Sequence, residues 1–299
     1  SWKEVECKKG GASASNRQLT VTGDAVLSIS IDEWQDNIKT IARPSTASKQ
    51  VQIITPSFYI PQLKRARRVW IYLPENYSNS TARYPVLYMH DGQNVFEDTS
   101  SYAGEWGIDE FMDTTTAKKC IIVGIDNGTD KRLNEYSPYD FELSGIAANY
   151  KTNKGEGALY IDFLVKTLKP FIDKKYRTLR DKPNTFIAGS SMGGLISLYA
   201  VLKYPKVFGA AGVFSPAFWI SGTKIYTDIK KRGKSVNSKI YFYGGKLEGD
   251  SMISDMLKAF YGMNSVSKSK MTSVIRDDGM HNEATWRREF PLFYQWMMR

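Results

Sequence analysis

The segment TFIAGSSMGG, residues 185–194, decides the fold predicted for this chain. Its apolar start, Thr185–Ala188, indicates a strand, and the residues after it match the pattern G-x-S-x-G with Ser191 at the centre. From Met192 to Leu202, apolar residues then recur at helical spacing. A strand, a tight turn and a helix in this order lift the central serine above a sheet edge, where its hydroxyl can act as a nucleophile. The alternative is a glycine-rich turn with an inert serine.

On both sides of this segment, short apolar runs alternate with longer amphipathic runs. The alternation predicts a mainly parallel sheet flanked by helices, with the first strands antiparallel. Apolar residues at four-residue spacing between Leu159 and Ile172 predict one helix. Others are expected over Met252–Phe260 and at the end of the chain. The eight candidate strands are Val51–Ile54, Val69–Leu73, Val86–His90, Ile121–Ile125, Thr185–Ala188, Ala211–Phe214, Ile240–Tyr243 and Thr272–Ile275.

The composition is that of an ordinary globular protein, with 42% hydrophobic and 24% charged residues among 299. This length fits one large α/β domain, alone or with a small appendage. The net charge is +10, but the basic residues are dispersed and the longest basic clusters, Lys64–Arg68 and Lys230–Arg232, are short. We therefore expect no nucleic-acid partner. No apolar run approaches the roughly 20 residues that span a bilayer, so no membrane span is expected.

Residues 1–42 are expected to form a short β segment that precedes the main domain, residues 43–299. Strands are predicted at Gln18–Thr22 and Ala25–Ile31, around a Gly-Asp turn. About 40 residues of strand cannot bury a core alone, so this segment would dock on the next domain or be the tail of a larger module.

Two cysteines, Cys7 and Cys120, are too few and too far apart for a zinc site or a disulfide framework, and their redox state stays open. Because the chain begins at Ser1 and not at Met, we expect a processed or truncated product. The expected location is periplasmic or secreted.

A serine hydroxyl is a weak nucleophile that needs a general base, and the chain has only two histidines, His90 and His281. In folds with the G-x-S-x-G turn, the histidine follows the last strand. His281 follows the last candidate strand, so we expect it to accept the proton of Ser191. His90 ends the third candidate strand, comes too early in chain order, and is expected to be structural. The alternative for His281 is an ordinary surface histidine.

A carboxylate should orient the imidazole from the loop after the strand Ile240–Tyr243. Glu248 and Asp250 both qualify from their positions alone. Asp250 also lies near the expected start of a helix, where a carboxylate commonly caps free backbone N–H groups.

Two backbone N–H groups are expected to stabilise a developing oxyanion. Met192 follows the nucleophile at a helix N-terminus, and Gln93 lies in the loop after the third candidate strand. Gly92 would let this loop approach a substrate. Two histidines and two cysteines in these positions make no recognisable metal site, and no cofactor is expected.

With these residues in view, the chain resembles the esterase branch of the α/β-hydrolases, which includes esterase D, enterochelin esterases, and feruloyl and acetylxylan esterases. The likeness covers about residues 50–299. It rests on four blocks in order: YPVLYMHDGQN (84–94), IAGSSMGG (187–194), YPKVFG (204–209) and DGMH (278–281). It implies an α/β-hydrolase fold with a mainly parallel eight-stranded sheet.

The resemblance also implies site residues and a substrate class. The acid of these esterases commonly follows Gly-x-x, which favours Glu248 after Gly245. Residues 16–21 and Trp34 look like the end of a starch-binding carbohydrate module. The implied activity is that of a serine esterase that forms an acyl-enzyme on an acetyl or hydroxycinnamoyl ester of a carbohydrate.

Three other functions stay open at this point. A ferric-siderophore esterase would act on an anionic substrate, which suits the positive charge. An acyltransferase would use a sugar or lipid in place of water. A catalytically dead binding protein is the least favoured, since Ser191 and His281 both stand where catalysis needs them.

Overall fold

The computed structural model describes residues 6–7, 33–34, 44–142 and 153–299. The chain divides into two units, Ser1–Pro44 and Ser45–Arg299. In the first unit, strand β1 (Glu6–Cys7) pairs antiparallel with strand β2 (Glu33–Trp34).

The two strands predicted within residues 18–31 lie outside the described residues. The likeness of residues 16–21 and Trp34 to the end of a carbohydrate module stays a prediction.

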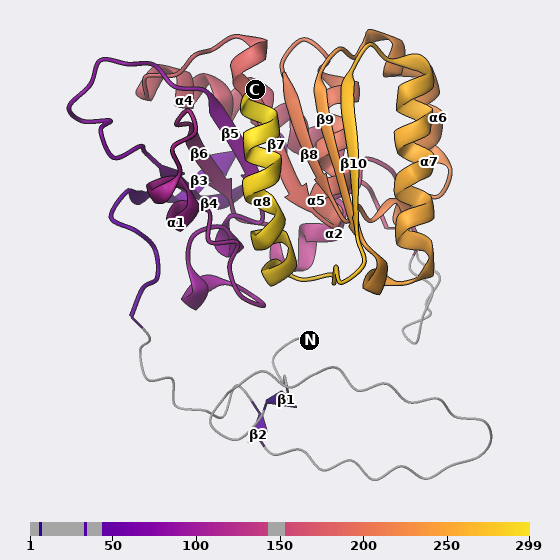
Figure 1. The fold of residues 1–299 in the computed structure, drawn as a ribbon, viewed down its shortest axis with the longest axis horizontal. Coiled ribbons are helices and arrows are strands. Elements are labelled where there is room, and N and C mark those ends of the chain that lie inside the picture. Colours follow the sequence, from indigo (N-terminus) through magenta and orange to yellow (C-terminus); the bar gives the residue numbers. More distant parts are fainter. Residues whose placement is uncertain (1–5, 8–32, 35–43, 143–152) are drawn as a thin grey trace. The chain divides into compact units, whose positions relative to one another are not determined.

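The second unit is built on an eight-stranded sheet with the strand order β10-β9-β8-β7-β5-β6-β4-β3 (Figure 1). The strand β4 pairs antiparallel with both of its neighbours, and all other pairs are parallel. All eight predicted strands and the antiparallel start are confirmed. The strands are β3 (Val51–Ile60), β4 (Arg65–Tyr72), β5 (Val86–His90), β6 (Ile121–Ile125), β7 (Thr185–Ser190), β8 (Ala210–Phe214), β9 (Lys239–Gly245) and β10 (Lys270–Arg276).

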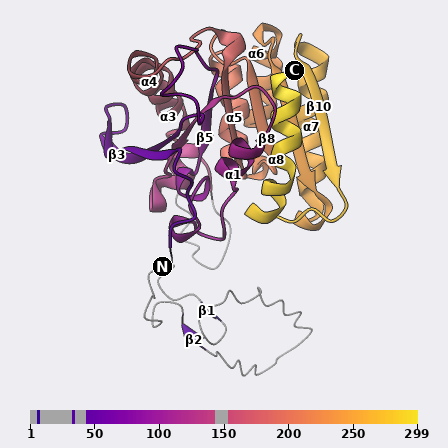
Figure 2. The same ribbon diagram turned by 60° about the vertical axis from the view of Figure 1, so that its left-hand side comes forward.

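Helices cover both faces of this sheet, and α1 and α8 lie on the same side of it (Figure 2). The residues 157–175 form one helical stretch interrupted by a π turn at Leu164–Leu168. The α-helices are α1 (Ile108–Thr114), α2 (Arg132–Tyr136), α3 (Gly157–Phe163), α4 (Lys169–Lys175), α5 (Met192–Lys203), α6 (Lys224–Arg232), α7 (Asp250–Val266) and α8 (Glu283–Met298). Among the described residues, none of these helices is both long and apolar enough to cross a membrane.

Alternate side chains of the central strands fill two separate cores. In β5, Val86 and Tyr88 join the core under α3 to α7, whereas Leu87 and Met89 join the core under α1 and α8. This period of two follows from the pleat of a strand that is covered on both faces. Burial on both faces also explains why β5 reads as a continuous apolar run.

The topology brings four loops to one edge of the sheet. The strands β7, β8, β9 and β10 are successive parallel neighbours, so their carboxyl ends lie side by side. The chain passes through Ser191, Ser215, Glu248 and His281 in the loops after these strands. In open α/β sheets, ligands bind at this edge.

Candidate active site

The turn after β7 holds Ser191 in an unusual backbone conformation, with φ 58° and ψ −118°. Such a conformation is strained for a residue with a side chain. Hydrogen bonds fix it on both sides: the N–H of Ser191 donates to Phe214 O at 2.9 Å, and its carbonyl accepts from Ala217 N at 3.0 Å. The helix α5 begins at the next residue, Met192. The strand, turn and helix predicted around Ser191 are therefore present.

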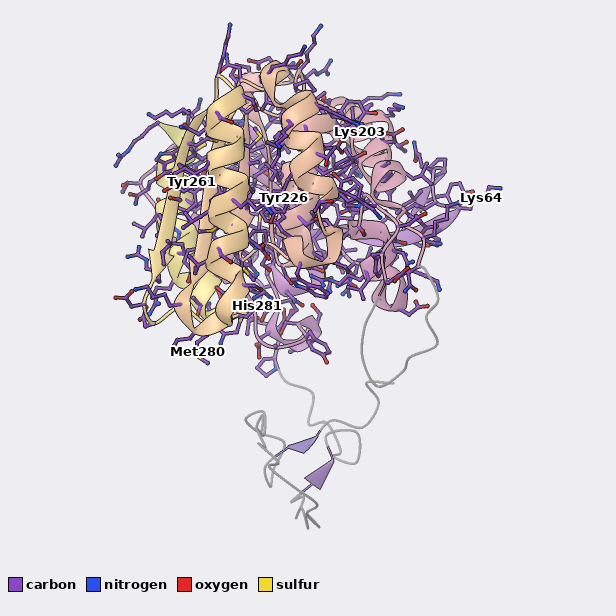
Figure 3. The ribbon with its side chains drawn as sticks, turned by 90° about the vertical axis from the view of Figure 1, so that its right-hand side faces the viewer. Lys64, Lys203, Tyr226, Tyr261, Met280 and His281 are labelled. Carbon is purple, nitrogen blue, oxygen red and sulfur yellow. The ribbon has the colours of Figure 1, made fainter. Side chains whose placement is uncertain are left out.

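The loops after β9 and β10 bring Glu248 and His281 together. His281 Nδ1 lies 2.7 Å from Glu248 Oε2. The Glu248 side chain is fully buried, whereas 38% of the His281 side chain is exposed. Trp286 of α8 packs edge-on against the imidazole, with 5.1 Å between ring centroids. Figure 3 shows His281 next to Met280 at the end of the sheet where α7 begins.

Glu248 is held by two donors besides His281. Its Oε1 accepts from Gly245 N at 2.6 Å and from the hydroxyl of Ser215 at 2.8 Å. Because a carboxylate only accepts hydrogen bonds, the proton between Glu248 and His281 belongs to Nδ1. The other ring nitrogen, Nε2, is then free to act as a base.

The loops of Glu248 and His281 touch through two glycines. A β-carbon on Gly245 would overlap the backbone of Gly279, and a β-carbon on Gly279 would meet Gly245 Cα at 2.5 Å and the Tyr243 hydroxyl at 2.7 Å. The contact is reinforced by Leu247 N, which donates to Gly279 O at 3.0 Å. Only glycine fits at these two positions, because the backbones are too close for any side chain.

The other candidate acid, Asp250, is the first residue of α7. Its side chain lies outside the described residues. The pairing of His281 with Glu248 supports the choice that the Gly-x-x spacing favoured.

His90 lies against the turn that holds Ser191 and is 2% exposed. Its Nδ1 lies 2.9 Å from the Tyr160 hydroxyl, and its buried Nε2 has no hydrogen-bond partner in the described part of the chain. Burial lowers the pKa of His90 to about 3. It packs against Gly189 and Gly193, so that a β-carbon on Gly189 would meet the imidazole at 3.0 Å. A buried, neutral histidine in this place fits the structural role that its position predicted.

The loop after β5 starts at Asp91, which has φ 55° and caps the 3-10 turn Gly92–Asn94. Arg132 of α2 holds the Asp91 carboxylate through two hydrogen bonds of 2.7 and 2.8 Å, and Asn127 donates to it at 2.7 Å. Burial opposes the charge of Asp91, but the guanidinium lowers the pKa of this carboxyl below its usual value. The backbone of this loop is thus fixed by an ion pair that the sequence did not reveal.

Gly92 serves a different contact from the one expected. A β-carbon there would meet the backbone of Gly124 and Ile125 at 2.7 to 2.8 Å. The glycine therefore lets the loop pack against the end of β6. The next residue, Gln93, accepts from Asn127 N at 3.2 Å through its side-chain carbonyl.

The two expected oxyanion donors, Met192 and Gln93, lie at a helix start and in the loop after β5. Met192 is the first residue of α5, and the first N–H groups of a helix have no partner within the helix. Gln93 lies in the 3-10 turn that follows β5. Their role as donors stays a prediction.

The segment between β6 and α3 carries polar and aromatic side chains, including Arg132, Glu135 and Tyr136. Its described residues make structural contacts: Glu135 is fully buried and pairs with Arg65 at 2.8 Å and with Arg67. The Tyr136 hydroxyl accepts from Asp91 N at 3.1 Å. Through the Tyr136 hydroxyl, this segment therefore holds the start of the loop after β5.

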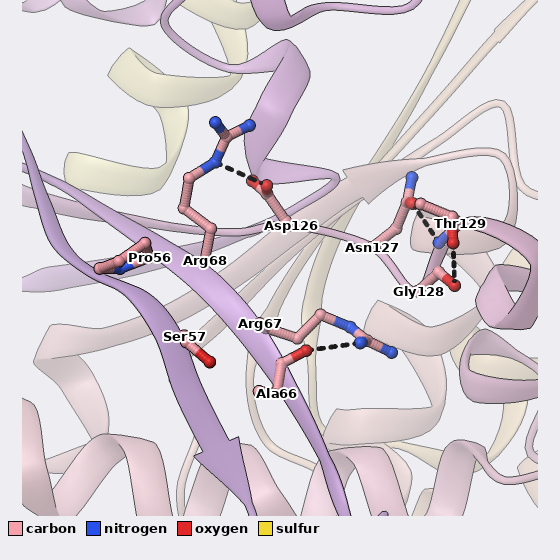
Figure 4. Close-up of a pocket in the computed structure, with 9 residues that line it drawn as sticks. All are labelled: Pro56, Ser57, Ala66, Arg67, Arg68, Asp126, Asn127, Gly128 and Thr129. Carbon is pink, nitrogen blue, oxygen red and sulfur yellow. Dashed lines mark hydrogen bonds and ion pairs between the residues drawn. The ribbon is translucent and has the colours of Figure 1, made fainter.

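A cavity of about 430 Å³ lies beside this segment, at the crossing of β3 and β4 with the end of β6 (Figure 4). The arginines on its wall are already paired, Arg68 with Asp126 at 2.8 Å and Arg67 with Glu135. Ser191, Glu248 and His281 do not line it.

One group of carboxylates among the described residues could hold a metal ion. Glu105, Asp109 and Glu110 each bring an oxygen within 4.8 Å of the other two. Arg287 already faces them, 3.3 Å from Glu110 and 3.8 Å from Glu105. Burial, with the nearby charge of Glu110, raises the pKa of Glu105 to about 7. These residues lie in and before α1, outside the four strand-end loops.

Comparison with known proteins shows the family of this chain. The profile described as Putative esterase matches residues 60–292. The uncharacterized protein YbbA of Bacillus subtilis is 28% identical over 153 residues, 51% of this chain and 58% of that protein. An endo-1,4-beta-xylanase/feruloyl esterase of Xylanibacter ruminicola is 28% identical over 228 residues, 73% of this chain and 27% of that protein. The chain spans less than two thirds of the length of these relatives.

Among solved structures, an enterobactin esterase from Shigella flexneri has a TM-score of 0.65 and 20% identity, covering 85% of this chain and 60% of that one. This likeness shows the fold, and the predicted α/β-hydrolase architecture is confirmed.

Proposed function

The chain belongs to the Putative esterase family, and we propose that it is a hydrolase in which Ser191, Glu248 and His281 form the catalytic triad. The observation that carries the proposal is the 2.7 Å contact between His281 Nδ1 and Glu248 Oε2. It leaves the other imidazole nitrogen free to serve the strained serine in the turn after β7. The reaction is the hydrolysis of a carboxylic ester through an acyl-enzyme.

In the first half of this reaction, Ser191 Oγ attacks the carbonyl carbon of the ester while His281 Nε2 takes its proton. The negative charge that forms on the carbonyl oxygen is stabilised by the N–H groups of Met192 and Gln93. When the tetrahedral intermediate collapses, Nε2 gives the proton to the leaving alcohol. Glu248 stays ionised and stabilises the imidazolium.

The second half repeats these steps with water. His281 Nε2 takes a proton from water, whose oxygen attacks the acyl carbon. The bond to Ser191 Oγ breaks, Nε2 returns the proton to it, and the carboxylic acid leaves.

The proposed substrate is an acetyl or hydroxycinnamoyl ester of a carbohydrate. The relative from Xylanibacter ruminicola, named as a xylanase and feruloyl esterase, supports this class. Trp219 supports it too: this residue is 58% exposed and lies two residues after Ala217, whose N–H donates to the backbone of Ser191. A flat, apolar indole in this place suits stacking on a sugar or aromatic ring. Such a substrate would place the enzyme in the periplasm or outside the cell, which fractionation of the producing cells tests.

A siderophore ester is the second candidate. The resemblance of the fold to the enterobactin esterase of Shigella flexneri favours it. A side-by-side assay with an aryl acetate, an acetylated sugar, a feruloyl sugar and a catecholate trilactone decides between the two classes. A carbohydrate esterase is expected to have its highest kcat/KM on the feruloyl sugar or on an acetylated sugar, and the highest value on the trilactone would reverse the order.

The triad itself is tested by Ser191→Ala. Loss of the attacking hydroxyl is expected to lower kcat by about 10³-fold or more and to abolish labelling by a fluorophosphonate, with the fold retained. Residual activity above about a tenth of wild type would rule out Ser191 as the nucleophile. Ser238→Ala is the control, because it also removes one serine hydroxyl, which in Ser238 is buried and donates to Phe208 O at 2.8 Å.

A further inference from the structure

Ser215 is a buried serine that the proposed chemistry does not use. It is the first residue after β8, is fully buried and has φ 42°. Its N–H donates to Tyr243 O at 2.7 Å, which ties this turn to β9. Phe214, directly before it, and Ala217, two residues after it, make the hydrogen bonds that hold Ser191.

The hydroxyl of Ser215 lies between the acid and a residue of α8. Trp286 Nε1 lies 2.9 Å from Ser215 Oγ, and Ser215 Oγ lies 2.8 Å from Glu248 Oε1. An indole N–H can only donate and a carboxylate can only accept, so the direction of both bonds is fixed. Trp286 donates to Oγ, and the Ser215 proton points at Glu248.

We propose that Ser215 is a positioning residue that holds Glu248 in the rotamer in which Oε2 faces His281. The inference rests on the proposed function, since it takes Glu248 as the triad acid. The hydroxyl anchors Oε1 together with Gly245 N–H, which leaves Oε2 for the imidazole. The hydrogen bond from Ser215 matters because the Glu248 carboxylate is fully buried. Few water molecules can reach it to replace a lost donor.

The position of Ser215 gives it a second consequence. Its turn is bonded to Ser191 on one side and to Glu248 on the other, so nucleophile and acid are held by one four-residue segment, Phe214–Ala217. A shift of this segment would therefore displace Ser191 and Glu248 together. A site that must keep its groups within about 0.5 Å gains from such a shared support.

The first test is Ser215→Ala, assayed for kcat and KM on one ester. Loss of a hydrogen bond to a buried charge is expected to lower kcat by about 10- to 100-fold with little change in KM. Ser238→Ala, which also removes a buried serine hydroxyl, is expected to keep wild-type kcat. A Ser215→Ala variant with wild-type kcat would overturn the inference.

A double variant separates positioning from a general loss of structure. If Ser215 acts through Glu248, adding Ser215→Ala to Glu248→Gln lowers kcat no further, because the acid that it positions is already gone. The same fold-loss in both backgrounds would mean that the hydroxyl acts independently and would overturn the inference.

A spectroscopic readout follows the imidazole directly. The chain contains only two histidines, so ¹⁵N spectra of the labelled rings are simple to assign. Neutral His281 in the wild type is expected to carry its proton on Nδ1, and Ser215→Ala is expected to populate the Nε2-protonated tautomer. An unchanged tautomer ratio in Ser215→Ala would contradict the positioning role.

Failure of the proposed function would look different. If Ser191→Ala stayed active, the nucleophile would be wrong, and if Glu248→Gln kept wild-type kcat, the acid would be wrong. If both of those variants are inactive and Ser215→Ala is not impaired, only the inference about Ser215 fails.

Discussion

Ser191 is held in a backbone conformation that costs about 1–3 kcal/mol for a residue with a side chain. The cost is met by local contacts: its N–H and its carbonyl are both bonded to the turn after β8, and α5 starts directly behind it. Small residues make room for this turn, because Gly189 and Gly193 pack on the His90 side chain. The strain presents the hydroxyl at the sheet edge.

At the residue scale, two variants decide whether Glu248 or Asp250 is the acid of the proposed triad. Glu248→Gln is expected to lower kcat by about 10⁴-fold with little change in thermal midpoint, because the amide can present its N–H side to His281 and disfavour the Nδ1-protonated form. Asp250→Asn is expected to keep its activity and lose about 0.3–1 kcal/mol of stability, because a negative charge favours the first turn of a helix. Measurement of kcat and thermal midpoint for both variants tests this. The opposite pattern would move the acid to Asp250.

The sequence predicted these single residues unequally well. The pattern G-x-S-x-G and the position of His281 after the last strand were sufficient to nominate two groups, because their chemistry depends on chain order. Ser215 and Arg132 act through contacts between residues far apart in the chain, and no local pattern marks such a contact. A serine directly after an apolar strand, as in VFSP (213–216), was the only available signal.

At the scale of elements, the four-residue spacing of apolar residues explains why the helical stretch 157–175 contains a π turn. Tyr160, Leu164, Leu168 and Ile172 are all buried, although a strict four-residue repeat drifts by about 40° per step on an α-helix. The π turn at Leu164–Leu168 has more residues per turn and corrects this drift. The sequence predicted the helix, and its spacing already contained the signal of the π turn.

The loop after β5 offers a prediction at the same scale. Asp91→Asn keeps the size and the left-handed conformation but leaves the Arg132 guanidinium without its partner. We expect this variant to lower the free energy of unfolding by about 2–3 kcal/mol. This value lies at or below the low end of the range for breaking a buried ion pair, because the Arg132 side chain is 26% exposed. The value of kcat should also fall, because the Gln93 N–H is carried by this loop.

Urea unfolding of Asp91→Asn, Arg132→Gln and the double variant checks this prediction. The double variant leaves no unpaired charge and is expected to be more stable than Asp91→Asn alone. Equal stability of the two would show that the ion pair does not hold the loop.

At the scale of the whole molecule, stability is expected to fall in mild acid because of His90. Its pKa is about 3 in the folded protein, against about 6.5 for an unperturbed histidine. Between these values the unfolded chain binds a proton that the folded protein does not, so stability decreases as the pH falls from 6.5 toward 3. The loss at pH 5 should be about 2 kcal/mol. Burial is the main cause of the lowered pKa; Asp91 opposes it and Arg132 adds to it.

The matched variant is His90→Gln, compared with wild type by urea unfolding at pH 7 and pH 5. The variant is expected to lose about 2 kcal/mol less than wild type between the two pH values. An equal loss in both proteins would show that other groups cause the acid sensitivity.

The fold as a whole could be predicted from the sequence, because strand spacing and apolar periodicity are local features of the chain. All eight strands were located, and the mainly parallel order follows from the alternation with helices. The order of the strands in space and the pairing of Arg65 and Arg67 with Glu135 were not predicted, because they depend on packing between distant segments.

The contact between Gly245 and Gly279 limits how genes of this family can be recombined. The two glycines leave no room for each other's side chains, so the loops that carry Glu248 and His281 fit together only as a pair. A crossover between residues 245 and 279 joins the loop after β9 of one parent to the loop after β10 of the other. Active chimeras from such crossovers are expected only when both parents have glycine at both positions, whereas crossovers before β9 or after α8 begins leave the pair intact.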